Sequence, residues 1–354
     1  MNKFFCILCI LLFISKTENV FSNNLIYDVN NVAAQGALNN SFTDNKLIES
    51  AFKKAFIIFV NKTLLKKDAL SLYKTKSKTI KDLVLTYQII KSEKNKDKNI
   101  SMLNIRFDPK KINNFLAKRG ISYADISNIS LTLLPILIKD KNVFLYEENL
   151  FYKNWNKFED KEVSTNDKLI NYNLALENIE DLKYINSNKQ NLDLIDINKI
   201  KSFNDSTNYV LLIIYFTEDK FKAFIKTSIK NKDIDRSVDL ILSQKNENKL
   251  YEEAIITLKK EIDQIWKGQN LIDVNTPSFL DFFLIIKKID DYLKLKFILD
   301  SIDIVENHSV LEITNKYSKI RIKYRGKINK IKDKLTEKKI NIQIVDNVWQ
   351  LNIQ

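Results

Sequence analysis

The stretch KIRIKYRG, residues 319–326, decides how the last part of the chain folds. Four basic residues alternate with three apolar ones, so in a strand the cations lie on one face and the apolar side chains on the other. After Gly326 the apolar period changes to that of a helix. The apolar positions of this expected helix are Ile328, Ile331 and Leu335.

Predicted elements on both sides of this stretch complete a unit over residues 278–354. Strand, helix, strand, strand, helix, strand is the ferredoxin-like order, βαββαβ. Many unrelated proteins share this order, so it does not indicate a function by itself. The other expected elements are a strand over 279–286, a helix over 290–301, an extended segment over 302–314, and strands over 340–345 and 348–353.

A central unit is predicted over residues 125–268. Its first strand, Leu131–Ile138, is an almost continuous apolar run, which is typical of a strand covered on both faces. Pro135 cannot donate to a strand ladder, so it predicts an edge position or a bulge. A long amphipathic helix ends the unit at Gly268. Also expected are short helices or turns over 174–182 and 192–200, a hairpin of 209–216 and 221–226, and a strand over 238–242.

The first unit is predicted over residues 23–124, and a linker over 269–277 follows the central unit. Asp108-Pro109 opens a helix that Gly120 ends, because Asp caps a helix and Pro fits its first turn. The fold class is therefore α+β, with three small α/β units in tandem. The remaining elements expected in the first unit are a strand over 25–32, a helix over 47–60 capped near Thr43, and strands over 83–91 and 102–107 joined by the charged linker 92–98.

Residues 1–22 read as an export signal, with Lys3 at the positive end, an apolar run over 4–14 and a cleavage site after Ser22. This run is too short to span a bilayer, which takes about 20 residues. Cleavage also removes both cysteines, so the mature chain has no thiolate. We therefore expect an exported, periplasmic protein without a membrane span.

The charge of the chain is unevenly distributed. The formal net charge of the 354 residues is +13, and 45% of the residues are hydrophobic, as in a globular protein. Lysine greatly outnumbers arginine, as the codons of an AT-rich genome would produce. Codon bias does not explain the segment 316–339, which contains eleven basic and two acidic residues.

This basic segment is the candidate binding site. Such a face suits an envelope protein or an anionic envelope component. The plain alternative is a solvated sheet face whose lysines discourage edge pairing. Nucleic acid is not expected, because export removes the usual targets and no aromatic platform interleaves the charges. The candidate residues are Lys319, Arg321, Lys323 and Arg325 on the strand, with Lys327, Lys330 and Lys334 extending the charge onto the helix.

Catalytic and metal chemistry find little support in the sequence. His308 is the only histidine, which excludes two-histidine metal sites and the usual histidine-based catalytic arrangements within one chain. The acidic residues Asp233, Asp235 and Asp239 lack the glycine and the distal glutamate of a calcium loop. We expect no cofactor and no metal. A glycosidase-like hydrolase needs two facing carboxylates. Glu147-Glu148 and Glu252-Glu253 could supply such a pair, so this alternative remains open from the sequence.

A series of short stretches carries a family resemblance: Leu25–Val29, Ile105–Pro109, Phe115-Leu116, Gly120-Ile121, Leu133–Leu137, Leu176–Leu182, Thr207–Leu212, Tyr324–Gly326 and Trp349–Leu351. By their order, the chain resembles the exported bacterial envelope proteins grouped as domain of unknown function 2066, over nearly all of its mature length. One stretch departs from the family pattern, which has a Tyr-Gly-Ala-Asp-like sequence where this chain has Ser206–Tyr209. The resemblance implies export in a Gram-negative cell and supplies no catalytic residues.

Together these features favour a non-enzymatic periplasmic binding or envelope-assembly factor that captures its partner through the basic face. One alternative is a hydrolase that acts on an envelope polymer through paired carboxylates. Another is a purely structural scaffold or homo-oligomer.

Overall fold

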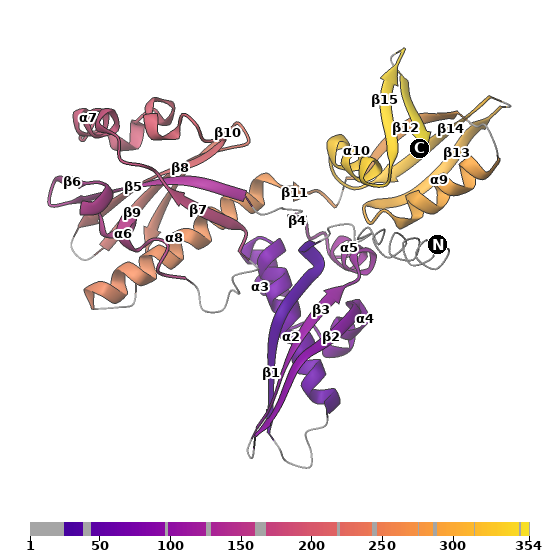
Figure 1. Ribbon diagram of the computed structural model, residues 1–354, viewed down its shortest axis with the longest axis horizontal. Coiled ribbons are helices and arrows are strands. Elements are labelled where there is room, and N and C mark those ends of the chain that lie inside the picture. Colours follow the sequence, from indigo (N-terminus) through magenta and orange to yellow (C-terminus); the bar gives the residue numbers. More distant parts are fainter. Residues whose placement is uncertain are drawn as a thin grey trace, which may run out of the picture.

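The structure is a computed structural model of a mixed α+β protein (Figure 1). One hydrophobic core lies in the N-terminal unit, one lies on each face of a central sheet, and another lies in the C-terminal unit. The predicted signal peptide, residues 1–22, and the predicted cap Thr43 lie outside the described part of the chain. The structure describes residues 25–37, 44–95, 98–124, 129–159, 168–217, 220–242, 246–274, 276–285, 289–314, 316–346 and 348–353.

Within these ranges, no helix combines the length and the hydropathy that a membrane crossing requires.

The first unit contains an antiparallel sheet of three strands in the order β1-β3-β2. The predicted helix over 47–60 is confirmed as α2, whose apolar stripe is buried in the first core. The segment 92–98 is not a linker, because β2 and β3 both continue into it. Helices α3 and α4 were not predicted. The elements are η1 (Leu25–Tyr27), β1 (Asp28–Ala37), α2 (Asp44–Thr63), α3 (Lys66–Leu72), α4 (Ser77–Leu83), β2 (Val84–Asn95), β3 (Lys98–Phe107) and α5 (Pro109–Ala117).

Both ends of α5 follow from the sequence. The side chain of Asp108 accepts a hydrogen bond from the Lys111 amide at 3.1 Å, and Pro109 occupies the first turn. Gly120 follows the helix with a φ of +64°, in the left-handed region that glycine adopts without steric cost. The predicted start and end of this helix are confirmed.

The central sheet runs in the order β10-β9-β8-β5-β6, and β7 also pairs with β5. The parallel neighbours β5 and β8 are buried on both faces, as the apolar run in β5 predicted. Helices α6 and α8 cover one face, while residues in and near α7 and the 3₁₀ turns after it cover the other. The elements are β4 (Tyr123–Ala124), β5 (Ile129–Lys139), β6 (Asn142–Phe144), η2 (Tyr146–Glu148), α6 (Leu150–Asn154), β7 (Ile170–Leu174), α7 (Ile179–Ser187), η4 (Leu192–Leu194), η5 (Ile197–Lys199), η6 (Lys201–Phe203), β8 (Asn208–Thr217), β9 (Lys220–Ile229), β10 (Lys232–Leu240) and α8 (Glu247–Gln269).

Pro135 lies in the interior of the sheet without a bulge, so the predicted edge position is wrong. On the side of β5 away from β8, β7 pairs with Ile129–Leu133 and β6 pairs with Leu137–Lys139, which leaves position 135 between them. The Asn149 Nδ2 donates to the Pro135 carbonyl at 2.8 Å. Proline is tolerated because no strand on this side needs the N–H that it lacks.

Residues 269–277 are not a simple linker. Helix α8 passes Gly268, and β11 (Leu271–Ile272) then pairs antiparallel with β4. Ile272 and Val274 pack into the core of the first unit. The segment therefore ties the end of the central unit back to the first.

The C-terminal unit has the predicted βαββαβ order with one added strand. Its sheet order is β13-β14-β12-β16-β15. Strand β16 returns from β15 and lies between β15 and β12, parallel to β12. The elements are β12 (Ser278–Ile285), α9 (Ile289–Ser301), β13 (Val305–Ile313), β14 (Tyr317–Tyr324), α10 (Ile328–Glu337), β15 (Ile340–Val345) and β16 (Val348–Ile353).

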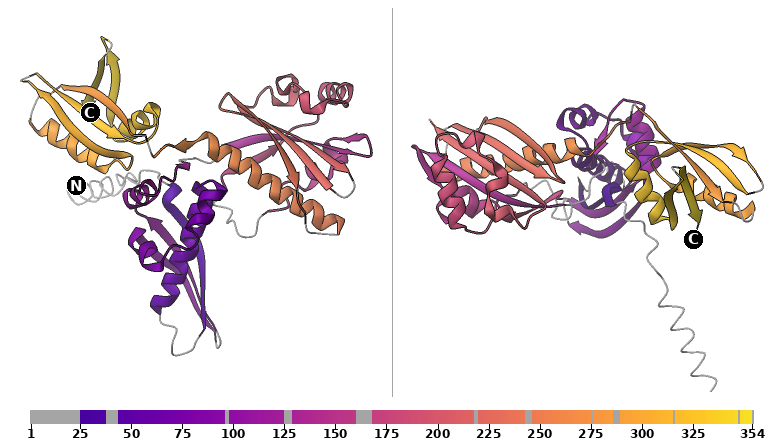
Figure 2. Two further views of the ribbon diagram at one scale, coloured as in Figure 1. Left: turned by 180° about the vertical axis from the view of Figure 1, so that it is seen from behind. Right: turned by 90° about the horizontal axis from the view of Figure 1, so that it is seen from above.

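The first unit contacts both of the others, and the three meet at one junction (Figure 2). The Tyr27 hydroxyl donates to Asn113 Oδ1 at 3.0 Å, and Asn113 Nδ2 donates to the carbonyl of Asp303 in the C-terminal unit at 3.2 Å. Toward the central unit, Lys267 of α8 donates to the Asn61 carbonyl at the end of α2.

Candidate binding face

The C-terminal sheet is covered on one face only. Side chains from α9 and α10 join the core with alternate residues of β12 and β14, such as Phe282 and Ile322. The residues between them point away from this core: Phe279 is 58% exposed and Ile285 is 45% exposed. Within the described residues, no element covers this side. We call it the open face and define it by Phe279, Asp281, Phe283 and Ile285 of β12 and Lys319, Arg321 and Lys323 of β14.

The two strands of the open face are in register, so each cation has a neighbour on β12. Lys323 lies opposite Phe279, and Arg321 lies opposite Asp281. Lys319 lies opposite Phe283. Side chains directly opposite on one face of an antiparallel pair are close enough to interact. A basic column therefore runs beside a column that is mainly apolar.

Arg321 is held by a carboxylate. Its Nε and one terminal nitrogen lie 2.6 and 2.7 Å from the two carboxylate oxygens of Asp281, the bidentate geometry that suits guanidinium. This hydrogen bond lowers the pKa of Asp281 below its ordinary value. The predicted cation at this position is present, but its charge is balanced locally.

Glu306 on β13 forms ion pairs with two more of the predicted cations. Lys323 Nζ lies 2.9 Å from Glu306 Oε2, and Arg325 Nε lies 2.6 Å from Oε1. Partial burial of Glu306 favours its neutral form, but the hydrogen bond from Lys323 and the two positive charges outweigh it and lower the pKa of Glu306. The Arg325 side chain is only 11% exposed, so it lies at the border of the open face and holds Glu306 there rather than offering its charge to a partner.

Aromatic rings lie beside the basic column on this face, although the basic stretch read alone shows no aromatic platform. Lys319 Nζ lies 5.7 Å from the centre of the Phe283 ring, which meets Tyr317 edge to face at a centroid distance of 5.1 Å. These rings come from β12 and the start of β14, so the quoted basic stretch alone does not contain them. Residues 279–285 are apolar apart from Asp281, so they predict a strand without showing which side chains are exposed, and only the strand register places the rings beside the lysines.

The lysines of α10 do not extend the open face, because that helix packs on the other side of the sheet. Lys327 is exposed at its N-cap and Lys330 is partly exposed on its first turns. Lys334 is buried, with Nζ 3.9 Å from Asp303 Oδ1 and 3.8 Å from Glu337 Oε2. The predicted binding residue Lys334 is therefore an internal residue near the junction.

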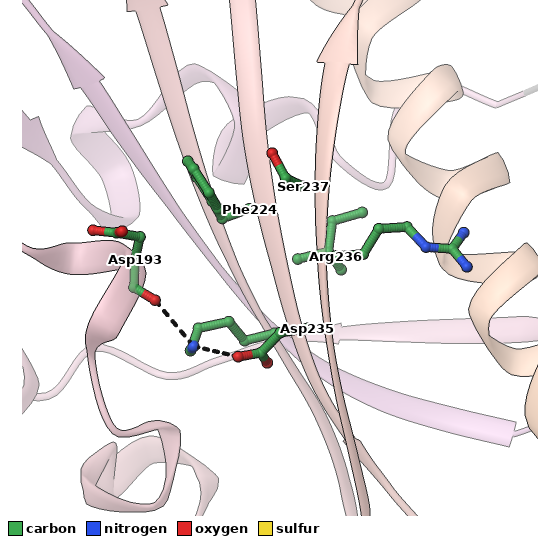
Figure 3. Close-up of a pocket in the computed structure, with 7 residues that line it drawn as sticks. Asp193, Phe224, Asp235, Arg236 and Ser237 are labelled. Carbon is green, nitrogen blue, oxygen red and sulfur yellow. Dashed lines mark hydrogen bonds and ion pairs between the residues drawn. The ribbon is translucent and has the colours of Figure 1, made fainter.

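A shallow cavity of about 130 Å³ lies on the central unit between η4 and the strands β9 and β10 (Figure 3). Lys226 Nζ donates to Asp235 Oδ2 at 2.6 Å and to the Asp193 carbonyl at 3.1 Å. In Figure 3 the Asp193 carboxylate points away from this lysine, and Arg236 points away from the cavity toward α8, where its Nη1 lies 3.3 Å from Glu261 Oε2. The cavity does not present two facing carboxylates, so it lends no support to the hydrolase alternative.

The other carboxylates weighed in the sequence lie apart from the open face. Asp233, Asp235 and Asp239 are on the edge strand β10. Glu147 and Glu148 are exposed on η2, and Glu252 and Glu253 are partly exposed on α8. No group of three or more His, Cys, Asp or Glu residues that could hold a metal ion occurs in the described ranges.

His308 lies on β13 with Nε2 3.1 Å from Asp300 Oδ1. The one histidine thus has a nearby carboxylate at the surface of the C-terminal unit.

A polar cluster on α8 has strongly perturbed titratable groups. Burial raises the pKa of Asp263 to about 6 and lowers the pKa of Lys259, one turn before it, to about 8. Lys259 Nζ lies 5.7 Å from the ring centres of both Trp155 and Tyr172. Perturbed groups often mark functional sites, but ion-pair networks perturb pKa values in the same way. Since Lys267, one turn after Asp263, donates to the first unit, we interpret the cluster as a structural network at the junction.

Comparison with known proteins adds no family: no family model matches the chain, and no curated protein matches it.

Proposed function

We propose that this chain is an exported, non-enzymatic binding protein of the bacterial envelope, and that the open face is its contact surface for a protein partner. The observation that carries the proposal is a sheet face without a covering helix, on which exposed Phe279 and Ile285 adjoin a column of cations. Export and the envelope location rest on residues 1–22 and on the family resemblance. Both are proposals.

The balance of charges favours a protein over an anionic polymer. Asp281 pairs with Arg321, and Glu306 is shared by Lys323 and Arg325, so two of these three positive charges are balanced in place and electrostatic capture alone would be weak. Protein interfaces instead combine aromatic residues and Arg at their centre with a polar rim. The open face has this composition.

The contact is tested by placing a photo-crosslinking amino acid at position 279 in the full chain produced in envelope-forming cells. The matched control carries the same group at Phe297 on α9, which is 78% exposed on the helical side of the same unit. We expect a single saturable protein adduct from position 279 and none from position 297. Equal adducts at both positions, or none at either, would contradict the proposal.

A second variant tests whether the positive charges of the basic column contribute to the contact at position 279. Lys319→Glu with Lys323→Glu reverses two cations beside the exposed aromatics without touching the buried side of β14. The adduct at position 279 should fall by roughly tenfold, as the loss of ~1.4 kcal/mol of complementarity would produce. Circular dichroism and the melting temperature show whether the variant keeps its fold. An undiminished adduct would show that the basic column takes no part.

Export is tested separately by sequencing the N-terminus of the protein recovered from the periplasmic fraction. We expect the mature chain to begin at Asn23. Recovery of an uncleaved chain in the cytoplasm would contradict the location and leave the contact experiment to stand on its own.

A further inference from the structure

The edge strands of the sheets differ in how many charged residues they carry to prevent pairing with another chain. At the edge of the central sheet, β10 carries charge at five of its nine positions. Charged side chains are the usual means by which an edge strand avoids pairing with another chain. Strand β2 is an edge strand of twelve residues in the first unit, and its first seven, Val84–Ile90, carry no charge and no proline.

The uncharged run of β2 also exposes large apolar side chains. Leu85, Tyr87, Ile89 and Ile90 are between 47 and 51% exposed. In the described part of the chain β2 pairs with β3 alone, so its other side faces no strand. The register with β3 shifts at Val84/Thr86 and at Ile89/Lys91, which leaves a regular run of four residues between two irregular positions.

We propose that β2 pairs antiparallel with β2 of a second copy of this chain, joining two first-unit sheets into one across a two-fold axis. The free side of a strand offers backbone N–H and C=O groups, so its natural occupant is another strand. In a two-fold pairing the run meets itself. Since positions 84–90 are uncharged, no like charges are brought together there, and apolar side chains of the two copies lie opposite one another.

The strength of this association is limited by its size. A pairing of about seven residues per copy buries less than the ~1,600 Å² of a standard stable interface. We therefore expect a reversible dimer with a dissociation constant on the order of micromolar, as for small, transient interfaces. This inference is independent of the open face, which lies on another unit.

The test is sedimentation velocity of the full chain purified after export, over ~1 to 100 µM, where a micromolar equilibrium is visible. The wild type should shift from monomer to dimer as concentration rises. Gln88→Lys adds a charge in each copy at an exposed position of the run, and it should weaken dimerisation at least ~10-fold. Ser237→Lys on β10, the matched control, should change it less than ~2-fold.

A second change keeps the proposal falsifiable if one variant is unstable. Ile89→Lys places the charge on the neighbouring, half-exposed position, and the thermal transition of each variant reports whether it folds. A wild type that stays monomeric at all concentrations overturns the proposal. A dimer that folded Gln88→Lys and Ile89→Lys variants leave intact also overturns it.

Discussion

The central and C-terminal sheets bury strands of similar length in different ways. In the central sheet both faces of β5 and β8 are covered, and Leu212 and Ile213, neighbours on opposite faces of β8, are both fully buried. In the C-terminal sheet only one face is covered, so neighbours on β12 alternate between the core and the open face. The first arrangement places each residue in a core, whereas the second leaves half of the strand for contact with something else.

The largest expected difference between the two sheets is the cost of deleting an apolar side chain. Leu212→Ala removes fully buried atoms and should lower the free energy of unfolding by about 2 to 5 kcal/mol. Phe279→Ala removes a ring that is 58% exposed and should change it by only about 0.5 kcal/mol. Urea unfolding of both variants measures the contrast. Equal costs would mean that the open face is buried in solution.

The next largest expected loss of stability comes from removing Asn149, whose side chain hydrogen-bonds to the Pro135 carbonyl in the central sheet. Asn149 is fully buried, donates to the Pro135 carbonyl and accepts from the Phe151 amide at 2.9 Å. Asn149→Ala leaves both backbone groups without this partner and should cost about 2 kcal/mol. Asn154→Ala, at a partly exposed position at the end of the helix that Asn149 caps, is the control and should be close to neutral. If Asn149→Ala left the stability unchanged, the Pro135 carbonyl would have to find another hydrogen-bond donor.

The two sheets should also differ, by a smaller amount, in how the free energy of unfolding depends on pH. The pKa of Asp263, beside the central sheet, is raised to about 6, so the native state binds its proton more tightly than the unfolded chain. Stability should therefore fall as pH rises from about 4 to 6, by ~2 kcal/mol of the ~3 kcal/mol that the raised pKa can contribute, and stay nearly level above. Asp263→Asn should flatten this slope in thermal melts recorded across the range. A slope that persists in the variant would assign it to another group.

On the open face the smallest effect is expected, and its sign is opposite. The pKa of Asp281 is lowered by Arg321, so its contribution to stability is present above the ordinary aspartate pKa and is lost as pH falls below it. At neutral pH Asp281→Asn should change stability by only about 0.5 kcal/mol, because the pair is exposed to water. Melts at pH 7 and pH 3 measure it. A large loss at pH 7 would contradict an exposed face.

Local patterns were enough to predict much of the fold. The stripe that became α2, the Asp-Pro start of α5 and the alternation of β14 each report the environment of neighbouring residues. Pro135 was misplaced because its tolerance depends on where two other strands stop, which is not a local property. The short helices α3 and α4 have too few turns for their apolar period to stand out.

The candidate site was predicted only in part, for the same reason. The alternation of β14 correctly set Lys319, Arg321 and Lys323 on the exposed side. Their partners Asp281 and Glu306 come from β12 and β13, and only strand register brings them near. Helical spacing predicted the face of α10 on which Lys334 lies. It could not predict on which side of the sheet the helix packs.

The return of Ile272 and Val274 to the first core has a consequence for biogenesis. That core also contains Tyr27 and Phe56, so its last members follow its first by more than two hundred positions along the chain. Contacts of such high sequence separation form late, because a long loop must close first. During synthesis the N-terminus emerges first, so the first unit stays incomplete until the whole central unit has been made. Native assembly of the first unit is thereby coupled to synthesis of the second, and a chain stalled before residue 274 would expose an unfinished core to chaperones and proteases.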